Sequence, residues 1–221
     1  SIYADENGFY NISVTATGIV EGLVAAHETY PFYSYEDEIG GSSLSTLSII
    51  NQTCRVHNID TGLNYTAIQE AIDAPETEDG HTIFVEEGTY YEHVSVAKSI
   101  KLVGESRDTV IIDGNTKGTV IWVSADNVSI IDITIRNAGR TWGPPPRTGY
   151  PDSCILGNGV MHVRVENNTF SGTAVCVWLV YSSFVNISDN IVFDATYAGI
   201  VGYSSSSIMI CRNLVYHCGL M

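Results

Sequence analysis

The C-terminal half of the chain repeats a short pattern of apolar and polar positions. Four segments each carry two apolar residues separated by one position and close on an apolar pair or near-pair; they start at Val128, Val163, Val185 and Ile208. The starts are 35, 22 and 23 residues apart, and the longest gap holds an insertion at residues 139–152. Self-similarity at such a period is typical of solenoids, in which each repeat stacks on the one before it.

A repeat of 22 or 23 residues suits one coil of a right-handed parallel β-helix, an all-β solenoid with three short strands and three bends per coil. The leucine consensus of leucine-rich repeats, which have a similar period, is absent. The pattern predicts one dry interior column formed by Ile130, Val165, Ile187 and Ile210. Asn168, Asn190 and Asn213 share one repeat position and should form a second column. At a bend, where strand pairing is interrupted, their side-chain amides can hydrogen-bond the unpaired backbone groups.

Upstream of these repeats the pattern indicates one helix and then a series of short strands. Residues 64–75 carry an apolar stripe at helical spacing, Thr66 and Gln69 fit a capping box, and Pro75 ends the helix. From residue 82, short apolar runs alternate with turns rich in Gly, Asn and Asp. These runs predict strands at residues 83–85, 94–96, 100–103 and 110–112.

Residues 1–56 lack this period, and we interpret them as an N-terminal extension to a β-helix over residues 57–221. Within the extension, residues 9–14 alternate as a strand would, residues 17–29 suit a short helix, and residues 44–56 suit another strand. An extended segment can add to a neighbour's sheet edge, so the extension is a candidate assembly or strand-exchange segment.

Three strings in the first part of the β-helix are specific: YTAIQEAID from Tyr65, IFVEEGTYYEHV from Ile83 and IKLVGES from Ile100. On these strings residues 57–137 resemble the front end of pectin-lyase-like β-helix proteins. Residues 158–221 resemble the Asn-rich coils of NosD-like, carbohydrate-associated β-helix repeat proteins of archaeal cell surfaces. The resemblance implies that a helix at residues 66–74 caps the N-terminal mouth of the solenoid. That family contains enzymes, carbohydrate binders and structural proteins, so the fold alone does not determine function.

The sequence predicts no catalytic residues. By resemblance, the esterase branch requires a glutamine-bearing strand, an Asp-Thr-Leu-like string and a later Arg, yet no Asp-Thr-Leu and no Gln after Gln69 occur. The lyase branch needs a basic side chain, but Lys is absent after Lys117 and Arg is a poor base. The arginines that remain are Arg136, Arg140, Arg147, Arg164 and Arg212. We therefore interpret the protein as not an enzyme.

The insertion at residues 139–152 is the most distinctive surface feature of the sequence. Its aromatic rings suit sugar rings, its charged groups suit hydroxyls, and its proline run lowers the entropy cost of binding. We expect it to contact a carbohydrate or a second subunit, with folding against its own coil as the alternative. The candidate contact residues are Arg140, Trp142, Arg147, Tyr150 and Asp152.

No cofactor and no structural metal is expected, because the six histidines show no metal-ligand spacing. Alignment of the repeats puts Asp194 with His217 in one stacked position. A second, exposed position is shared by Asp132, Asn167, Asp189 and Arg212. The acidic residues of this second position could bind a calcium ion weakly. The ordinary interpretation is that these polar side chains are simply solvated.

The composition indicates an extracellular surface protein. A net charge of −15 with only ten Lys and Arg disfavours nucleic acid and anionic lipid, and no apolar run reaches 18 residues, so no membrane insertion is expected. The five cysteines leave one or two disulfides open, and Cys176 fits a small apolar residue of the stack. Six sequons, some of them expected by chance, give the glycosylation candidates Asn11, Asn51, Asn64, Asn127, Asn167 and Asn186.

Two functional hypotheses follow. The leading one is a structural extracellular surface glycoprotein, a subunit of an archaeal filament, sheath or S-layer-like assembly whose partners are copies of itself. The alternative is a carbohydrate-binding or polysaccharide-cleaving β-helix protein that uses residues 139–152 and has glycans as partners. The sequence stops at Met221, midway through a coil. We therefore expect either a longer β-helix or an end covered by another subunit in head-to-tail assembly.

Overall fold

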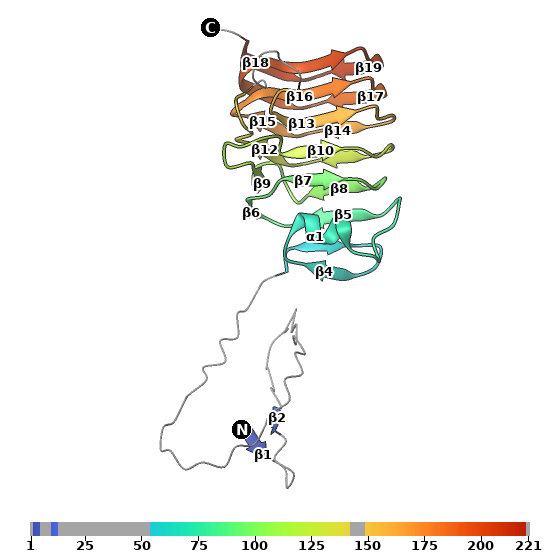
Figure 1. Ribbon diagram of the computed structural model, residues 1–221, viewed down its shortest axis with the longest axis vertical. Coiled ribbons are helices and arrows are strands. Elements are labelled where there is room, and N and C mark those ends of the chain that lie inside the picture. Colours follow the sequence, from blue (N-terminus) through green and yellow to red (C-terminus); the bar gives the residue numbers. More distant parts are fainter. Residues whose placement is uncertain (1, 5–9, 13–53, 142–148, 220–221) are drawn as a thin grey trace. The chain divides into compact units, whose positions relative to one another are not determined.

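A computed structural model describes residues 2–4, 10–12, 54–141 and 149–219 (Figure 1). The chain forms two compact units, residues 1–53 and 54–221. In the first unit, β1 (Ile2–Ala4) pairs antiparallel with β2 (Tyr10–Ile12), within the strand predicted at residues 9–14. The predicted helix at residues 17–29 lies outside the described residues, as does most of the strand predicted at residues 44–56.

The second unit is a parallel β-helix of about six coils, as the repeat predicted (Figure 1). One sheet joins, from one end to the other, β19 (Ser206–Cys211), β17 (Ser183–Ser188), β14 (Arg164–Glu166), β11 (Ser129–Ile131), β8 (Lys101–Gly104), β5 (Thr82–Val85), β3 (Val56–Asn58) and β4 (Leu63–Tyr65). The strands predicted at residues 83–85 and 100–103 lie in this sheet. Only β3 breaks the parallel order, because it pairs antiparallel with both β4 and β5.

The other sheet supplies the two remaining faces of the solenoid. Its first face contains β6 (Gly88–Tyr90), β9 (Val110–Asp113), β12 (Thr134–Arg136) and β15 (Thr169–Ser171). Its second face contains β7 (Val94–Val96), β10 (Ile121–Val123), β13 (Ser153–Asn158) and β16 (Thr173–Val180). The long strand β18 (Ile191–Tyr203) pairs with β15, β16 and β20 (Leu214–Cys218), so it belongs to both faces.

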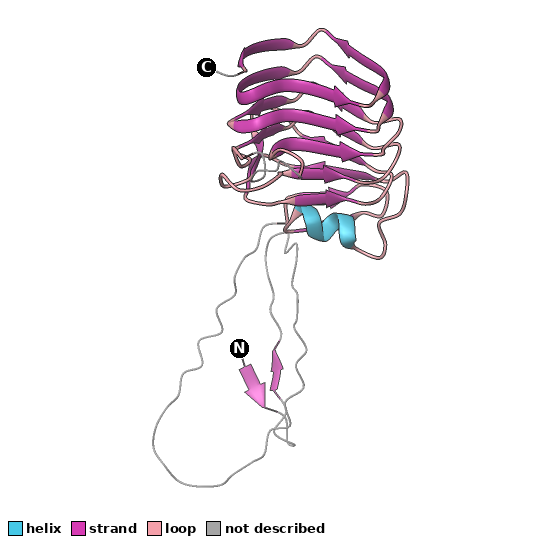
Figure 2. Cartoon of the chain, turned by 45° about the horizontal axis from the view of Figure 1, so that its top comes forward, coloured by secondary structure: helices cyan, strands magenta, loops and turns pink. Residues whose placement is uncertain are grey.

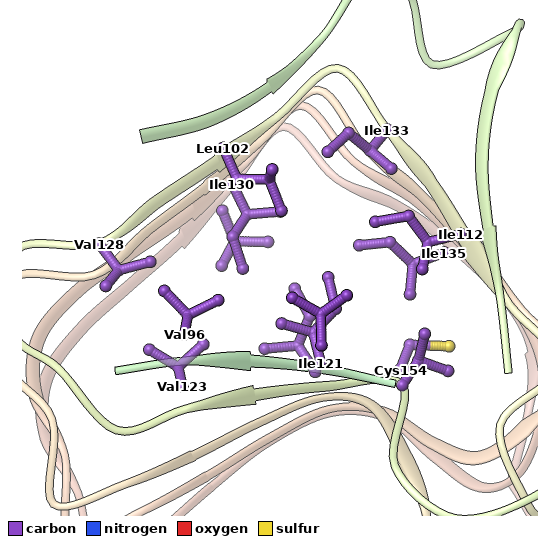
Figure 3. Packing of buried hydrophobic residues seen from close by; sticks show 14 of the residues in the cluster. Val96, Leu102, Ile112, Ile121, Val123, Val128, Ile130, Ile133, Ile135 and Cys154 are labelled. Atoms are coloured by element: carbon purple, nitrogen blue, oxygen red, sulfur yellow. The ribbon is translucent and has the colours of Figure 1, made fainter. Parts of the chain in front are cut away.

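The interior is a set of apolar columns that run from coil to coil. Ile130 lies in register with Val165, Val165 with Ile187, and Ile187 with Ile210, so the predicted stacking is confirmed. The first three side chains are fully buried, whereas Ile210, in the last described coil, is 51% exposed and does not lie in a dry interior. Figure 3 shows the same stacking for Leu102 over Ile130, where like side chains fill the centre of successive coils. This burial of apolar surface is the main stabilising term of the fold.

Cysteine side chains contribute to the same interior. Cys154 and Cys176 are fully buried, and each sulfur lies near a backbone carbonyl, that of Ser171 at 3.7 Å and that of Phe193 at 3.9 Å. Hydrogen bonding with Cys154, together with burial, raises the pKa of the Cys176 thiol. Cys176 is therefore a neutral core residue, as predicted.

The three stacked asparagines satisfy backbone groups at the bend between the sheets. Asn190 donates from Nδ2 to the Val165 carbonyl at 2.8 Å, and its Oδ1 accepts the Asn168 backbone N–H at 2.8 Å. Asn168 and Asn213 make the corresponding bonds to their own preceding coils. Because strand pairing is interrupted at this bend, each amide replaces two lost backbone partners.

Helix α1 (Ile68–Asp73) covers one end of the solenoid and buries Ile68, Ala71 and Ile72 (Figure 2). It is shorter than the predicted range of residues 64–75, because Leu63–Tyr65 pairs with β3 as strand β4. The predicted capping box of Thr66 and Gln69 is wrong, since the N-cap is Ala67 and no side chain caps from that position.

The side chain of Glu92 replaces the predicted capping box. The Glu92 carboxylate accepts the backbone N–H groups of Ile68 and Gln69 at 3.0 and 2.9 Å. Gln69 instead accepts the Ser95 N–H at 2.6 Å and donates to the Ser95 carbonyl at 3.2 Å, which closes the exposed edge of β7. The Gln69 amide therefore pairs with the open edge of β7 instead of capping the helix.

Candidate functional site

One outer face of the solenoid carries an aromatic and aliphatic row. In the short strands β7 and β10 alternate residues face the core, so Val94, Val96, Ile121 and Val123 are buried. The residue between each pair faces outward, and the register places these outward residues in one row: Ser95, Trp122, Leu156, Trp178 and Val201. Leu156 and Trp178 are nevertheless buried in a second apolar cluster with Val175 and Val180, so of the aromatic residues in this row Trp122 is the exposed one.

An open groove of about 530 Å³ lies at the β7 end of this row. Trp122 and Tyr150 form its aromatic wall, with ring centroids 6.3 Å apart and an interplanar angle of 68°. Both rings remain accessible, since Trp122 is 41% exposed and Tyr150 39%. The remaining lining residues are His93, Val94, Ser95, Thr119, Asp152 and Leu156.

Hydrogen bonds fix the polar side chains of the groove. His93 donates from Nδ1 to the Thr119 carbonyl at 2.8 Å, so Nε2 is the ring nitrogen left for a ligand. Asp152 Oδ2 accepts the Thr141 backbone N–H at 3.0 Å and the Thr141 hydroxyl at 2.5 Å. A wall of two rings beside an imidazole, a carboxylate and hydroxyls can stack on a sugar ring and bond its hydroxyl groups.

The structure brings together part of the predicted insertion site. Tyr150 and Asp152 line the groove, whereas Arg140 lines a different cavity of about 860 Å³ beside Asp194 and His217. Trp142 and Arg147 lie outside the described residues. The sequence interpretation missed His93, Thr119 and Trp122, which come from earlier coils. The sequence did hold a signal for Trp122, an aromatic residue flanked by two apolar ones in the string Ile121–Val123.

The predicted row of exposed acids holds its own partners. Asp132 accepts a hydrogen bond from the Asn167 side chain, and Arg212 binds Asp189 through Nε at 2.7 Å and Nη2 at 2.6 Å. The Arg212 hydrogen bond lowers the pKa of Asp189. Asp194 and His217 stack as predicted, with 3.9 Å between Asp194 Oδ1 and His217 Nδ1. Over the described residues, no cluster of three or more His, Cys, Asp or Glu could hold a metal ion.

Three of the arginines considered as bases are engaged in ion pairs. Arg136 binds the buried Asp113 at 2.8 Å, Arg164 binds Glu166 at 3.0 Å, and Arg212 binds Asp189. Gln69, the last glutamine in the sequence, bonds the edge of β7 at the capped end of the solenoid. Of the other two arginines, Arg140 lines the second cavity and Arg147 lies outside the described residues.

The sequons lie at different kinds of position. Asn64, Asn127 and Asn167 are exposed, and Asn186 is half-buried in β17. Asn11 lies in β2, whose side chains are not described, and Asn51 lies outside the described residues. In the same described ranges no helix has the length and apolar character to cross a bilayer.

Parallel coils, an interior asparagine column and a capping helix define a right-handed parallel β-helix. A family model described as a right-handed β-helix region matches residues 83–220, so the chain belongs to this family. The chain is 31% identical over 137 residues to a cell surface glycoprotein of Methanothermus fervidus, covering 62% of this chain and 21% of that protein. It therefore spans about a fifth of that relative's length.

A solved structure has the same architecture. Pectin methylesterase from Yersinia enterocolitica superposes with a TM-score of 0.51 at 20% identity, over 67% of this chain and 56% of that one. At this identity the likeness shows the fold alone.

Proposed function

We propose that the chain is a β-helix domain of a cell-surface glycoprotein and has a structural role outside the cell. The similarity to the Methanothermus fervidus cell surface glycoprotein is the observation that carries this proposal. The charge of −15 and three exposed sequon asparagines fit a hydrated, glycosylated exterior. The ion-paired arginines and the engaged Gln69 support a role that does not include catalysis.

Antibody labelling of intact cells that produce the full protein tests the location. We expect labelling without permeabilisation and loss of the epitope when protease is added to intact cells. Labelling that needs permeabilisation would refute the proposed location.

The finer proposal is that copies of the protein assemble into a filament or S-layer-like coat. The sheet of β1 and β2 has strands of three residues, and such a small sheet is marginal alone and leaves edges for another strand. Residues 1–56 are therefore proposed as the assembly segment, acting by strand exchange.

Negative-stain microscopy of the full chain, beside a variant that lacks residues 1–15, tests this assembly. We expect polymers from the full chain and dispersed particles from the deletion variant. Polymers that persist in the deletion variant would rule out strand exchange through this segment.

A second candidate function is carbohydrate binding in the groove, and the pair of Trp122 and Tyr150 is the observation that favours it. The carboxylate of Asp152 in the groove favours a neutral oligosaccharide over an acidic one.

Calorimetry with neutral and uronate oligosaccharides tests this function. Trp122→Ala should weaken binding of a neutral oligosaccharide by about 5- to 150-fold, if a sugar face stacks on the ring as strongly as a nucleobase does, at roughly 1–3 kcal/mol. Tyr181→Ala, an exposed aromatic residue outside the groove lining, should leave binding unchanged. No binding by the unmodified protein, or equal loss in both variants, would exclude the groove.

A further inference from the structure

Asn127 differs from the other sequon asparagines in what its side chain contacts. Asn167 donates to Asp132, Asn186 donates to Glu166 Oε1 at 2.9 Å, and Asn64 Oδ1 bonds the His57 ring at 2.6 Å. The Asn127 side chain is exposed and makes no hydrogen bond to any residue that the structure describes. Asn127 and Asn64, whose contact uses only its oxygen, are therefore the two described sequon residues whose amide nitrogen donates no hydrogen bond to a described residue.

An aromatic shelf, formed by His162 and Phe184, lies beside Asn127. The two rings stack with centroids 5.1 Å apart and an interplanar angle of 10°, and Phe184 is 57% exposed. Both residues have left-handed backbone, with φ of 58° and 55°. Ser207, at the same position of the next coil, shares this conformation, so it belongs to the coil turn, and this turn leaves the two rings exposed.

The register places Asn127 in the same column as the shelf. Ser129, Arg164 and Asn186 are register partners in adjacent coils, and the residue two positions before each is Asn127, His162 and Phe184. Asn127 shares their left-handed backbone, with φ of 57°, and its N–H donates to the Met161 carbonyl at 2.9 Å. Since adjacent strands lie about 4.8 Å apart, Phe184 lies about 10 Å along the column from Asn127. A short oligosaccharide on Asn127 is therefore within reach of both rings.

We propose that Asn127 carries an N-linked glycan whose first sugars pack on the shelf of His162 and Phe184. In the modification, Asn127 Nδ2 bonds the anomeric carbon of an oligosaccharide carried on a polyprenyl phosphate. The bond from that carbon to the phosphate oxygen breaks, the polyprenyl phosphate leaves, and the amide proton passes to a base of the transferase. Apolar sugar faces then cover aromatic surface that is otherwise exposed. This inference rests on the proposed location at the cell surface, where such glycans are displayed.

Glycopeptide mass spectrometry tests the attachment. The full chain is produced in an archaeal host that N-glycosylates its secreted proteins, and occupancy is measured at each sequon. We expect Asn127 to be glycosylated in most molecules and Ser129→Ala, which removes the sequon but keeps Asn127, to abolish that glycopeptide. An unmodified Asn127 overturns the inference, and if that protein still labels on intact cells the proposed function stands.

Thermal unfolding tests the contact between glycan and shelf. Phe184→Ala should lower Tm by about 2 °C more in the glycosylated protein than in the Ser129→Ala background, because the sugar contact is lost only in the first. Tyr91→Ala removes a ring that is 72% exposed and outside this column, and should change Tm equally in both backgrounds. Equal shifts for Phe184→Ala in the two backgrounds overturn the shelf contact.

Discussion

Single inward-facing side chains, buried or half-buried, hold neighbouring coils together where strand pairing stops. The amides of Asn168, Asn190 and Asn213 each bond to the preceding coil, and the sequence suggested this from their shared repeat position. Each amide offers both a donor and an acceptor, which the backbone at a bend requires. The same repeat position could not reveal which atoms are bonded, because that depends on the turn geometry.

Replacement of Asn190 by Ala should destabilise the protein by about 2–5 kcal/mol, because it leaves the Val165 carbonyl and the Asn168 N–H buried without partners. Urea unfolding monitored by circular dichroism measures the change. Asn167→Gly is the matched control, since Asn167 is exposed with φ of 54° and glycine tolerates that conformation. Similar losses for the two variants would contradict the role of the buried column.

Asp113 makes the stability of the fold depend on pH. Burial alone would raise the pKa of this carboxyl, but hydrogen bonds from Arg136, the Asn115 N–H and Asn137 together hold the pKa below its usual value. A carboxyl with a lowered folded-state pKa stabilises the fold above its unfolded pKa of about 3.9. That contribution is lost as pH falls through the lower, folded-state pKa.

The wild-type protein should therefore lose stability below about pH 4, whereas Asp113→Asn should show a flatter acid limb. Tm measured from pH 7 to pH 2 checks this, and the gap between the two proteins should narrow as the pH falls. A gap that stays constant over this range would exclude Asp113 as a source of the acid sensitivity.

At the scale of elements, the capping helix shows where a local pattern was overridden. The apolar stripe correctly indicated a helix, but its start moved to Ile68 because Leu63–Tyr65 pairs with β3. Glu92, which lies about one coil further along the chain, caps the helix by accepting two backbone hydrogen bonds. A contact over 24 residues leaves no local signal in the sequence.

Removal of this cap by Glu92→Ala should destabilise α1 by about 1–2 kcal/mol, since a carboxylate at a helix N-terminus satisfies otherwise unpaired N–H groups. Hydrogen exchange should show faster exchange in α1, while the strands of the later coils keep their protection. Glu78→Ala, an exposed acid after the helix, should leave exchange in α1 unchanged. Unchanged exchange in Glu92→Ala would show that the contact with Glu92 is dispensable.

At the scale of the whole molecule, each coil is stabilised by the coils on either side of it. Stability in such a solenoid is the sum of coil and interface terms, so the value of a side chain depends on whether both neighbours are present. Ile130 has no exposed surface, whereas Ile210, in the same column, is 51% exposed.

The same substitution should therefore cost different amounts along one column. Ile130→Ala should destabilise the protein by about 2–4 kcal/mol because it opens a cavity, and Ile210→Ala by about 1 kcal/mol or less. Chemical denaturation of both variants provides the comparison. Equal costs would show that burial in this column does not set the contribution of its members.

The sequence by itself determined the repeat, the interior columns and hence the coil, because stacking puts equivalent positions of successive repeats on top of one another. It also supplied Tyr150 and Asp152 as candidates for a surface site. Only the tertiary structure decided that these residues meet Trp122 and His93. The repeat alignment already places Asn127, His162 and Phe184, which precede Val128, Val163 and Val185, in one column, but only the structure shows that the two rings stack. The insertion at residues 139–152 makes one coil longer than the others, so residue spacing alone does not give the neighbours on the outer face there. Backbone pairing between coils fixes which of these residues lie side by side.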